Sequence, residues 1–297
     1  MSKKYIFSGI NFKEKKPHFI LDTRNENEEP TREFFPIMSK ELTITRFKNK
    51  YCIGRYDLST LESFACPNEK KVDQNPVCSD CFQYNGFNPA FYHVSNSEIS
   101  EKQRIYNFQE HIVYLAYFSE TIFKVGITNK HRQFDRWLEQ GARVSTVIFH
   151  CKDAYEARDL EVKVSNLLQI PEVIRKKTKS DLINFKIDPI KLEKQVTEAK
   201  EKINAGLDVS CENSKVHFLD QYYNPLEKVI TKDIIDLSEN KPLMISGKII
   251  GLFGSILVLE NQGHQFKVLL GKLIGHRVII SDTVETIHFE PTQAKLF

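Results

Sequence analysis

Long apolar segments are missing from this chain of 297 residues. No run reaches the roughly eighteen consecutive apolar residues that a membrane-spanning helix requires. The opening segment, Met1 to Ile10, is too polar and its apolar stretch too short for a signal peptide. We therefore expect a soluble, cytoplasmic protein without a membrane partner.

Cysteine is also scarce, with six residues in the whole chain. This number is too small for a disulfide scaffold in a chain of this length. In a reducing compartment, clustered cysteines indicate a metal site before they indicate disulfides. Two of the six, Cys151 and Cys211, lie far from the others in sequence and are expected to be ordinary reduced thiols.

The motifs of several large enzyme classes are absent as well. The chain has no P-loop, no G-x-G-x-x-G after a strand, no G-x-S-x-G and no H-E-x-x-H. The segment from Gly247 to Gly254 is rich in glycine, but its apolar alternation favours a hairpin. No helix pattern follows it to offer N-terminal amides to a phosphate. Nucleotide binding at this segment is therefore disfavoured.

Charge of one sign is lacking overall, because 42 basic residues face 39 acidic ones and the net charge is only +3. Such a total does not by itself argue for a nucleic-acid partner, since basic proteins bind through local patches. Residues 124–181 hold twelve Lys or Arg against eight Asp or Glu, a local excess of +4. Positive charge is thus concentrated in the middle of the chain.

The remaining composition is that of a globular protein, and the pattern predicts a multidomain α+β fold with three regions. Residues 1–107 form an N-terminal β-rich region that contains the clustered cysteines. Residues 108–206 form a β-β-α-β-α module followed by a further helix. Residues 207–297 form a C-terminal small β barrel or sandwich, because short apolar runs alternate there with glycine-bearing turns.

The middle region has the clearest periodicity. Its apolar residues alternate or repeat at spacings of three and four. We predict strands at 111–118, 122–128 and 145–150, and helices at 133–140, from Asp153 onwards, and at 189–205.

The clustered cysteines predict a structural zinc site. Cys78-Ser-Asp-Cys81 has a spacing that lets two thiolates reach one tetrahedral Zn²⁺, and Cys66 and Cys52 complete a four-thiolate shell with no position left for substrate. Four unrelated buried thiols are the alternative, and His93 is a possible substitute for Cys52. A redox role is disfavoured, because no βαβ pattern surrounds the pair.

The middle region also carries Val113-Tyr-Leu115, Lys124-Val-Gly126, Arg136-Trp137, and Glu161 within Glu156-Ala-Arg-Asp-Leu-Glu161 of the helix that starts at Asp153. In this order they resemble the landmarks of the GIY-YIG nuclease superfamily over about residues 110–185. The whole chain is also similar to an uncharacterised bacterial family known only as a domain of unknown function.

The resemblance implies hydrolysis of a phosphodiester at one divalent metal, Mg²⁺ or Mn²⁺. In it, Tyr114 matches the tyrosine of the first motif, Gly126 the glycine of the second, Arg136 the phosphate-stabilising arginine and Glu161 the metal-binding glutamate. Lys124 stands where the second motif has a tyrosine, so base chemistry by that tyrosine is lost, although Lys124 could still contact a phosphate.

Each of these residues also has a purely structural interpretation. Tyr114 could be a core residue, Arg136 could stack on Trp137 or pair with a neighbouring carboxylate, and Glu161 could pair with Arg136 or Arg158. The basic run Arg175, Lys176, Lys177 and Lys179 is either a solvated face or a track for a nucleic-acid backbone.

The leading hypothesis is a zinc-stabilised protein that engages DNA or RNA through the GIY-YIG-like module and cleaves it with Mg²⁺ or Mn²⁺. A non-catalytic module that only binds nucleic acid or protein is the alternative. Lys124 favours the alternative, whereas the joint presence of Arg136 and Glu161 favours the enzyme. A protein-interaction scaffold without a nucleic-acid role is a third hypothesis, and it rests on the near-neutral overall charge.

Overall fold

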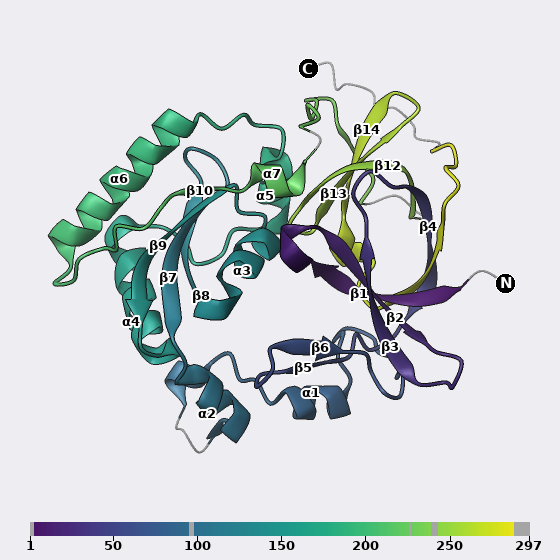
Figure 1. Cartoon of the computed structure of the whole chain (residues 1–297), viewed down its shortest axis with the longest axis horizontal. Helices are drawn as coiled ribbons and strands as arrows, with labels where there is room; N and C mark the ends of the chain where they lie inside the picture. Colours follow the sequence, from purple (N-terminus) through teal and green to yellow (C-terminus); the bar gives the residue numbers. More distant parts are fainter. Residues whose placement is uncertain (1–2, 95–97, 226, 239–242, 288–297) are drawn as a thin grey trace.

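The computed structural model describes residues 3–94, 98–225, 227–238 and 243–287. A nine-stranded sheet and a four-stranded sheet dominate the fold, and a two-stranded ribbon lies with the cysteines (Figure 1). Helices accompany the smaller sheet, so the fold is mixed α+β, as the sequence predicts. None of the described helices combines the length and the apolar character needed to cross a bilayer.

The nine-stranded sheet is built from both ends of the chain. Its order is β11-β14-β13-β12-β4-β15-β1-β2-β3, and its neighbours are antiparallel except β11 and β14. Figure 1 shows the sheet curling around its own core. The strands are β1 (Lys4–Asn11), β2 (His18–Arg24), β3 (Pro30–Pro36), β4 (Glu41–Lys50), β11 (Ile235–Asp236), β12 (Met244–Phe253), β13 (Ile256–Asn261), β14 (His264–Leu269) and β15 (His276–Ser281).

This sheet joins strands from the first and the last of the three predicted regions. Ile44 of β4 lies opposite Ile245 of β12 on one side and Ile280 of β15 on the other. Strands β1 to β4 of region 1–107 and β11 to β15 of region 207–297 are therefore parts of one sheet and share one core. The alternation of apolar and polar residues shows which face of a strand is buried. The backbone of that strand can form hydrogen bonds with many other strands, so the sequence does not show which strands pair.

The four-stranded sheet has the order β10-β9-β7-β8 and is antiparallel. The predicted elements of the middle region occur in the predicted order, with ends that differ by at most one residue. They are β7 (His111–Tyr117), β8 (Phe123–Asn129), α3 (Gln133–Gln140), β9 (Val144–Cys151), α4 (Ala154–Leu168) and α6 (Pro189–Gly206). The sequence did not predict α5 (Lys176–Leu182), nor β10 (His217–Phe218) and α7 (Asp220–Tyr223), which come from the region after residue 206.

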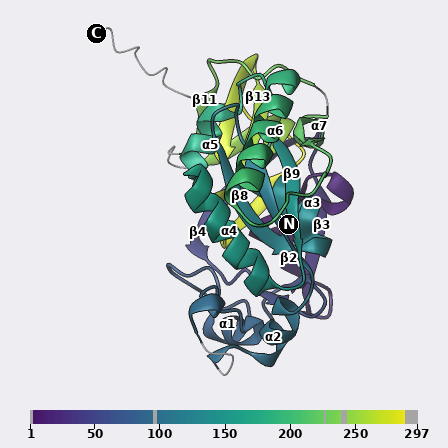
Figure 2. The same cartoon turned by 90° about the vertical axis from the view of Figure 1, so that its left-hand side faces the viewer.

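The two faces of this sheet pack against different layers. Val113, Leu115 and Val125 point toward α4 and α6, which cover the outer face (Figure 2). The alternate residues of β7, including Ile112 and Ala116, join the core of the nine-stranded sheet. Successive side chains of a strand point to opposite faces, so one hairpin serves two cores.

The part of the chain from Cys52 to the end of α2, which we call the cysteine segment, lies at one end of both sheets (Figure 1). Arg32 ties it to the nine-stranded sheet, because its guanidinium donates to Asp22 Oδ1 at 2.7 Å and Oδ2 at 2.8 Å and to the carbonyl of Ile53 at 2.6 Å. The segment contains β5 (Arg55–Asp57), β6 (Glu62–Phe64), α1 (Ser79–Asn85), η2 (Phe91–His93) and α2 (Glu101–Asn107). Short 3-10 turns elsewhere in the chain are η1 (Lys13–Lys15), η4 (Lys130–Arg132) and η5 (Leu270–Lys272).

We predict that Arg32→Ala lowers the free energy of unfolding by about 3–5 kcal/mol, because Asp22 would keep a buried charge without its partner. The side chains of this pair are only 8% and 3% exposed. Lys3→Ala is the control, since the exposed Lys3–Glu33 pair contributes at most about 1 kcal/mol. Urea denaturation measures both variants, and equal, small losses would contradict the assignment of Arg32 as the anchor.

Candidate functional site

The four clustered cysteines converge on one buried point. Their sulfur atoms all lie within 4.8 Å of one another, and the Sγ atoms of Cys66 and Cys78 are 4.0 Å apart. A regular tetrahedron with Zn–S bonds of about 2.3 Å has sulfurs about 3.8 Å apart, so this set could bind a metal such as zinc. Cys52 is a full member, and His93, exposed in η2, is not part of the set.

The surroundings of the cysteine cluster suit a structural metal. The amides of Gly54 and Cys78 donate to the Cys52 Sγ at 3.4 and 3.2 Å, as amides do around metal-bound thiolates. Burial raises the pKa of the Cys52 thiol to about 11 and also raises the pKa of Cys81. Four thiolates at this place therefore require a cation, and metal binding would release protons.

A second group of polar side chains gathers on the inner face of the hairpin. Tyr114 lies opposite Gly126, and Lys124 lies opposite Ala116, so all four share one face. A Cβ atom at Gly126 would lie 2.6 Å from the Tyr114 Oη and 2.8 Å from the Lys124 Nζ. The missing side chain of Gly126 thus makes the space in which the hydroxyl and the ammonium meet.

Helix α3 closes this space from one side. Arg136 and Gln140 are four residues apart and share a face of α3. The Gln140 Nε2 donates to the Tyr114 Oη at 2.9 Å, and Arg136 lowers the pKa of Lys124 through the repulsion of like charges. Arg136 is exposed and is not paired with Glu139, which accepts from Arg132 at 3.0 and 3.1 Å.

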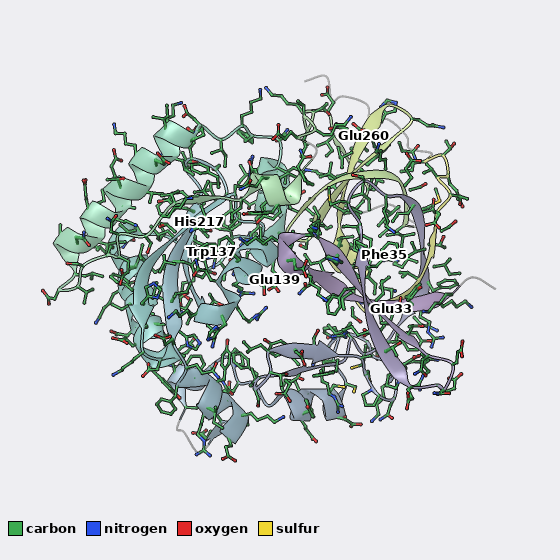
Figure 3. All side chains as sticks on the ribbon, in the orientation of Figure 1. Glu33, Phe35, Trp137, Glu139, His217 and Glu260 are labelled. Atoms are coloured by element: carbon green, nitrogen blue, oxygen red, sulfur yellow. The ribbon has the colours of Figure 1, made fainter. Side chains whose placement is uncertain are left out.

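Figure 3 shows where the labelled residues of α3 point. Trp137 lies beside His217 of β10, and the centroids of the two rings are 5.5 Å apart. Glu139 lies between the two sheets. Trp137 is fully buried, so its ring fixes the rotation of α3. This orientation leaves Arg136 on the open side of the helix.

Glu161 approaches from α4, whose buried stripe also contains Ala157 and Val164. Its carboxylate is 6% exposed and accepts from Arg158 at 2.6 Å, and the same Arg158 nitrogen contacts Glu172 at 2.7 Å. Burial raises the pKa of Glu161, while Arg158 and, more weakly, Lys124 oppose that rise. Of the two pairings that the sequence left open, the structure forms the one with Arg158.

Lys124, which is buried, and Lys179, which is half-buried, are the least exposed cations of the group. The Lys124 Nζ donates to the carbonyl of Glu172 at 3.0 Å, and the Lys179 Nζ donates to the carbonyl of Gln140 at 2.8 Å. The pKa of each lysine is lowered to about 8, mainly by burial and in addition by the repulsion of like charges, which comes from Arg136 for Lys124 and from Lys124 and Arg136 for Lys179. We call Tyr114, Lys124, Arg136, Gln140, Glu161 and Lys179 the polar cluster.

The basic run after α4 therefore divides in the structure. Arg175, Lys176 and Lys177 are exposed at the start of α5, as a solvated face or a phosphate track requires. Lys179 turns inward, and its ammonium lies 4.5 Å from the centroid of the Phe118 ring. The sequence placed all four on one surface, but a seven-residue helix exposes only part of its circumference.

Two polar groups of the hairpin that the sequence could not place now have positions. Tyr117 lies on the outer face and stacks on Phe123 with centroids 4.6 Å apart, so it is not part of the polar cluster. His111 is buried at the start of β7. Gln140 was missed by sequence analysis, although its spacing of four from Arg136 is a signal that it shares the same face.

Residues 39–274 match the model of a family described as "Protein of unknown function (DUF2797)". The chain belongs to this family. The match includes the cysteine cluster and the polar cluster, whereas β1 to β3 and β15 lie outside it. No curated protein and no solved structure matches this DUF2797 chain.

We predict one zinc ion per chain in protein purified without chelators. Cys78→Ser should abolish stoichiometric zinc and lower the melting temperature, because a structural metal contributes directly to local folding. Cys211→Ser is the matched control, since Cys211 lies outside the cluster and is half-buried. Metal analysis and native mass spectrometry measure the stoichiometry. Metal-free parent protein, or a Cys78→Ser variant as stable as the control, would remove the zinc site.

Proposed function

We propose that this chain binds DNA or RNA at the polar cluster and cleaves a phosphodiester there with the help of Mg²⁺ or Mn²⁺. Zinc at the cysteine cluster would stabilise the fold beside this site. The proposal combines the resemblance of the hairpin module to GIY-YIG nucleases with the charges that surround Gly126.

The observation that carries the proposal is a pair of lysines, one buried and one half-buried, that lack a direct counter-charge. Lys124 and Lys179 each donate to a backbone carbonyl, and within the described residues neither forms an ion pair. Buried charges in proteins are normally paired, because desolvation of a lone ammonium is costly. An anion beside Lys124, Lys179 and Arg136 would supply the missing charge.

A nucleic-acid phosphate suits this position better than an isolated small anion. Arg175, Lys176 and Lys177 extend the positive charge along the surface next to Lys179. A strand that places one phosphate over Gly126 would therefore have further basic side chains for its neighbouring phosphates. An arginine such as Arg136 offers forked donors to the oxygens of the central phosphate.

The remaining groups fit a hydrolytic step. Glu161 is a buried carboxylate with a raised pKa, which a bound cation would stabilise as an anion. Mg²⁺ held there would polarise the phosphate and supply a coordinated water. Lys124, with a pKa of about 8, would either accept a proton from water when neutral or hold the phosphate when charged.

Burial also limits what Tyr114 can do. Its pKa is raised to about 12, so it stays protonated at neutral pH and serves as a donor rather than as a base. Its hydroxyl accepts from Gln140, and its own proton remains for an acceptor above Gly126. We therefore assign Tyr114 to positioning of the phosphate or the attacking water.

A binding module without chemistry is the second candidate, and one contact favours it. Arg158 bridges Glu161 and Glu172 at 2.6 and 2.7 Å, so both carboxylates already have a positive partner. In that case the positive side of the cluster would hold nucleic acid, while Glu161 would only fix Arg158 and the segment after α4.

Two substitutions separate these candidates. If Glu161 holds a metal, Glu161→Gln should reduce cleavage by orders of magnitude and leave affinity nearly unchanged. Arg136→Ala should also depress the chemical rate more than affinity if its guanidinium stabilises charge that develops in the transition state. Asp159→Asn, exposed on the same helix, is the matched control.

A binding module predicts a different pattern for the same proteins. The parent would not cleave, Arg136→Ala would bind more weakly, and Glu161→Gln would bind equally or more tightly. Mixed single- and double-stranded DNA and RNA, with and without Mg²⁺ or Mn²⁺, serve as substrates. If neither substitution alters cleavage or binding, the polar cluster has no role in nucleic-acid chemistry.

The pH dependence identifies the task of Lys124, whose pKa is about 8. A base must be neutral, so the cleavage rate should rise through about pH 8 and then level off. A phosphate-binding cation must be charged, so affinity should instead fall as the pH passes about 8, with Lys179 contributing to the same fall. Lys124→Arg keeps the charge and cannot act as a base. Unchanged rate in Lys124→Arg would exclude the base role.

A further inference from the structure

A cavity of about 260 Å³ opens next to the polar cluster. It lies between the end of the cysteine segment, α2, the start of β7 and the η4–α3 junction. Its volume is just below the range of about 300–1,000 Å³ that is typical of small-molecule sites, so it suits one flat ring system. We call it the aromatic pocket, because its walls include Phe87, Phe91, Tyr106 and His111.

The aromatic walls are arranged edge to face. Phe87 and Tyr106 have centroids 6.5 Å apart at 83°, and Tyr106 and His111 have centroids 5.4 Å apart at 87°. Phe87 is 40% exposed, although exposing an aromatic ring to water is unfavourable. Aromatic side chains bind unstacked nucleobases by stacking on their faces.

One lining residue has an unmet hydrogen bond. Asn107 is fully buried, yet its Oδ1 atom has no partner within the described part of the chain. Its Nδ2 makes only a long contact of 3.5 Å to the hydroxyl of Tyr155. An unpaired buried acceptor costs stability, and a ligand that donates an N–H to it would remove that cost.

His111 supplies a second acceptor to the same walls. Its Nδ1 lies 2.9 Å from the carbonyl of Gln109, and because a carbonyl can only accept, Nδ1 carries the proton. Burial lowers the pKa of His111, so the ring is neutral at neutral pH. The Nε2 atom therefore bears a lone pair, and the pocket selects a ligand that is rich in N–H donors.

Arg136 connects the aromatic pocket to the polar cluster. It lines the pocket together with Arg132, and its charge also acts on Tyr114 and Lys124. A ligand that fills the pocket and reaches Arg136 would thus combine a flat, N–H-bearing ring with an adjacent anionic group. A nucleotide within a nucleic-acid strand has this composition.

We infer that the aromatic pocket binds one unpaired nucleobase that carries an amino group, adenine, cytosine or guanine, next to a phosphate held at the polar cluster. This inference rests on the proposed function, and it adds a basis for substrate choice. Uracil and thymine present a single N–H between two carbonyl acceptors, so they match Asn107 and His111 less well.

Binding of short single-stranded oligonucleotides that differ at one position tests the inference. The parent should bind strands with adenine or cytosine there about tenfold more tightly than strands with uracil or an abasic site. Asn107→Ala should remove the preference. Phe87→Ala should weaken binding to all bases, because Phe87 stacks on the face of a base and forms no hydrogen bond with its polar edge. Phe82→Ala is the matched control, with an exposed aromatic ring on α1 outside the pocket.

The outcomes separate the pocket from the proposed function. If Arg136→Ala weakens binding but the parent binds every base and the abasic strand equally, the pocket inference is overturned and the phosphate site stands. If no oligonucleotide binds, the proposed function fails. The pocket is then tested separately with adenosine and uridine, which carry no phosphate. Line broadening in NMR spectra by adenosine, lost in Phe87→Ala, would still support the pocket, and no response to either nucleoside would overturn it. Melting temperatures of all variants establish that they are folded.

Discussion

The hydrophobic core that the two sheets share is the constraint on which the candidate site depends. Ile112 and Ala116 on the inner face of β7, and Phe118 directly after it, belong to the core that also holds the interior of the nine-stranded sheet. Tyr114 lies in the same row and is fully buried, so its hydroxyl reaches only the space above Gly126. Polar groups can therefore collect only beside β8, which is an edge strand of its sheet.

Burial then determines the charges at that edge. The ammonium groups and the carboxylate of the polar cluster have little access to water, and this desolvation disfavours their charged forms. It therefore lowers the pKa of Lys124 and Lys179 and raises the pKa of Glu161. Arg158 offsets the negative side through Glu161 and Glu172. The positive side has no such partner among the described residues, which makes an anion the natural ligand.

Two close backbone approaches hold the parts of the molecule in these positions. A Cβ at Gly254 would lie 2.7 Å from the amide of Gly141, where the end of α3 meets the β12–β13 turn. A Cβ at Gly54 would lie 1.9 Å from the carbonyl of Phe64, where the cysteine segment folds back on itself. Both glycines also have positive φ, so a side chain there would strain the backbone as well. The glycines thus set how α3 and the cysteine segment are placed around the site.

The sequence by itself determined the type and order of most elements in residues 108–206, and the spacing of the four cysteines. These features follow from local periodicity and short-range geometry. Only the tertiary structure decided that β4 pairs with β12 and β15, that Lys179 turns inward, and that Glu161 pairs with Arg158. Strand pairing and burial join residues that are distant in the chain, and a periodic pattern shows which side is apolar but not what covers it.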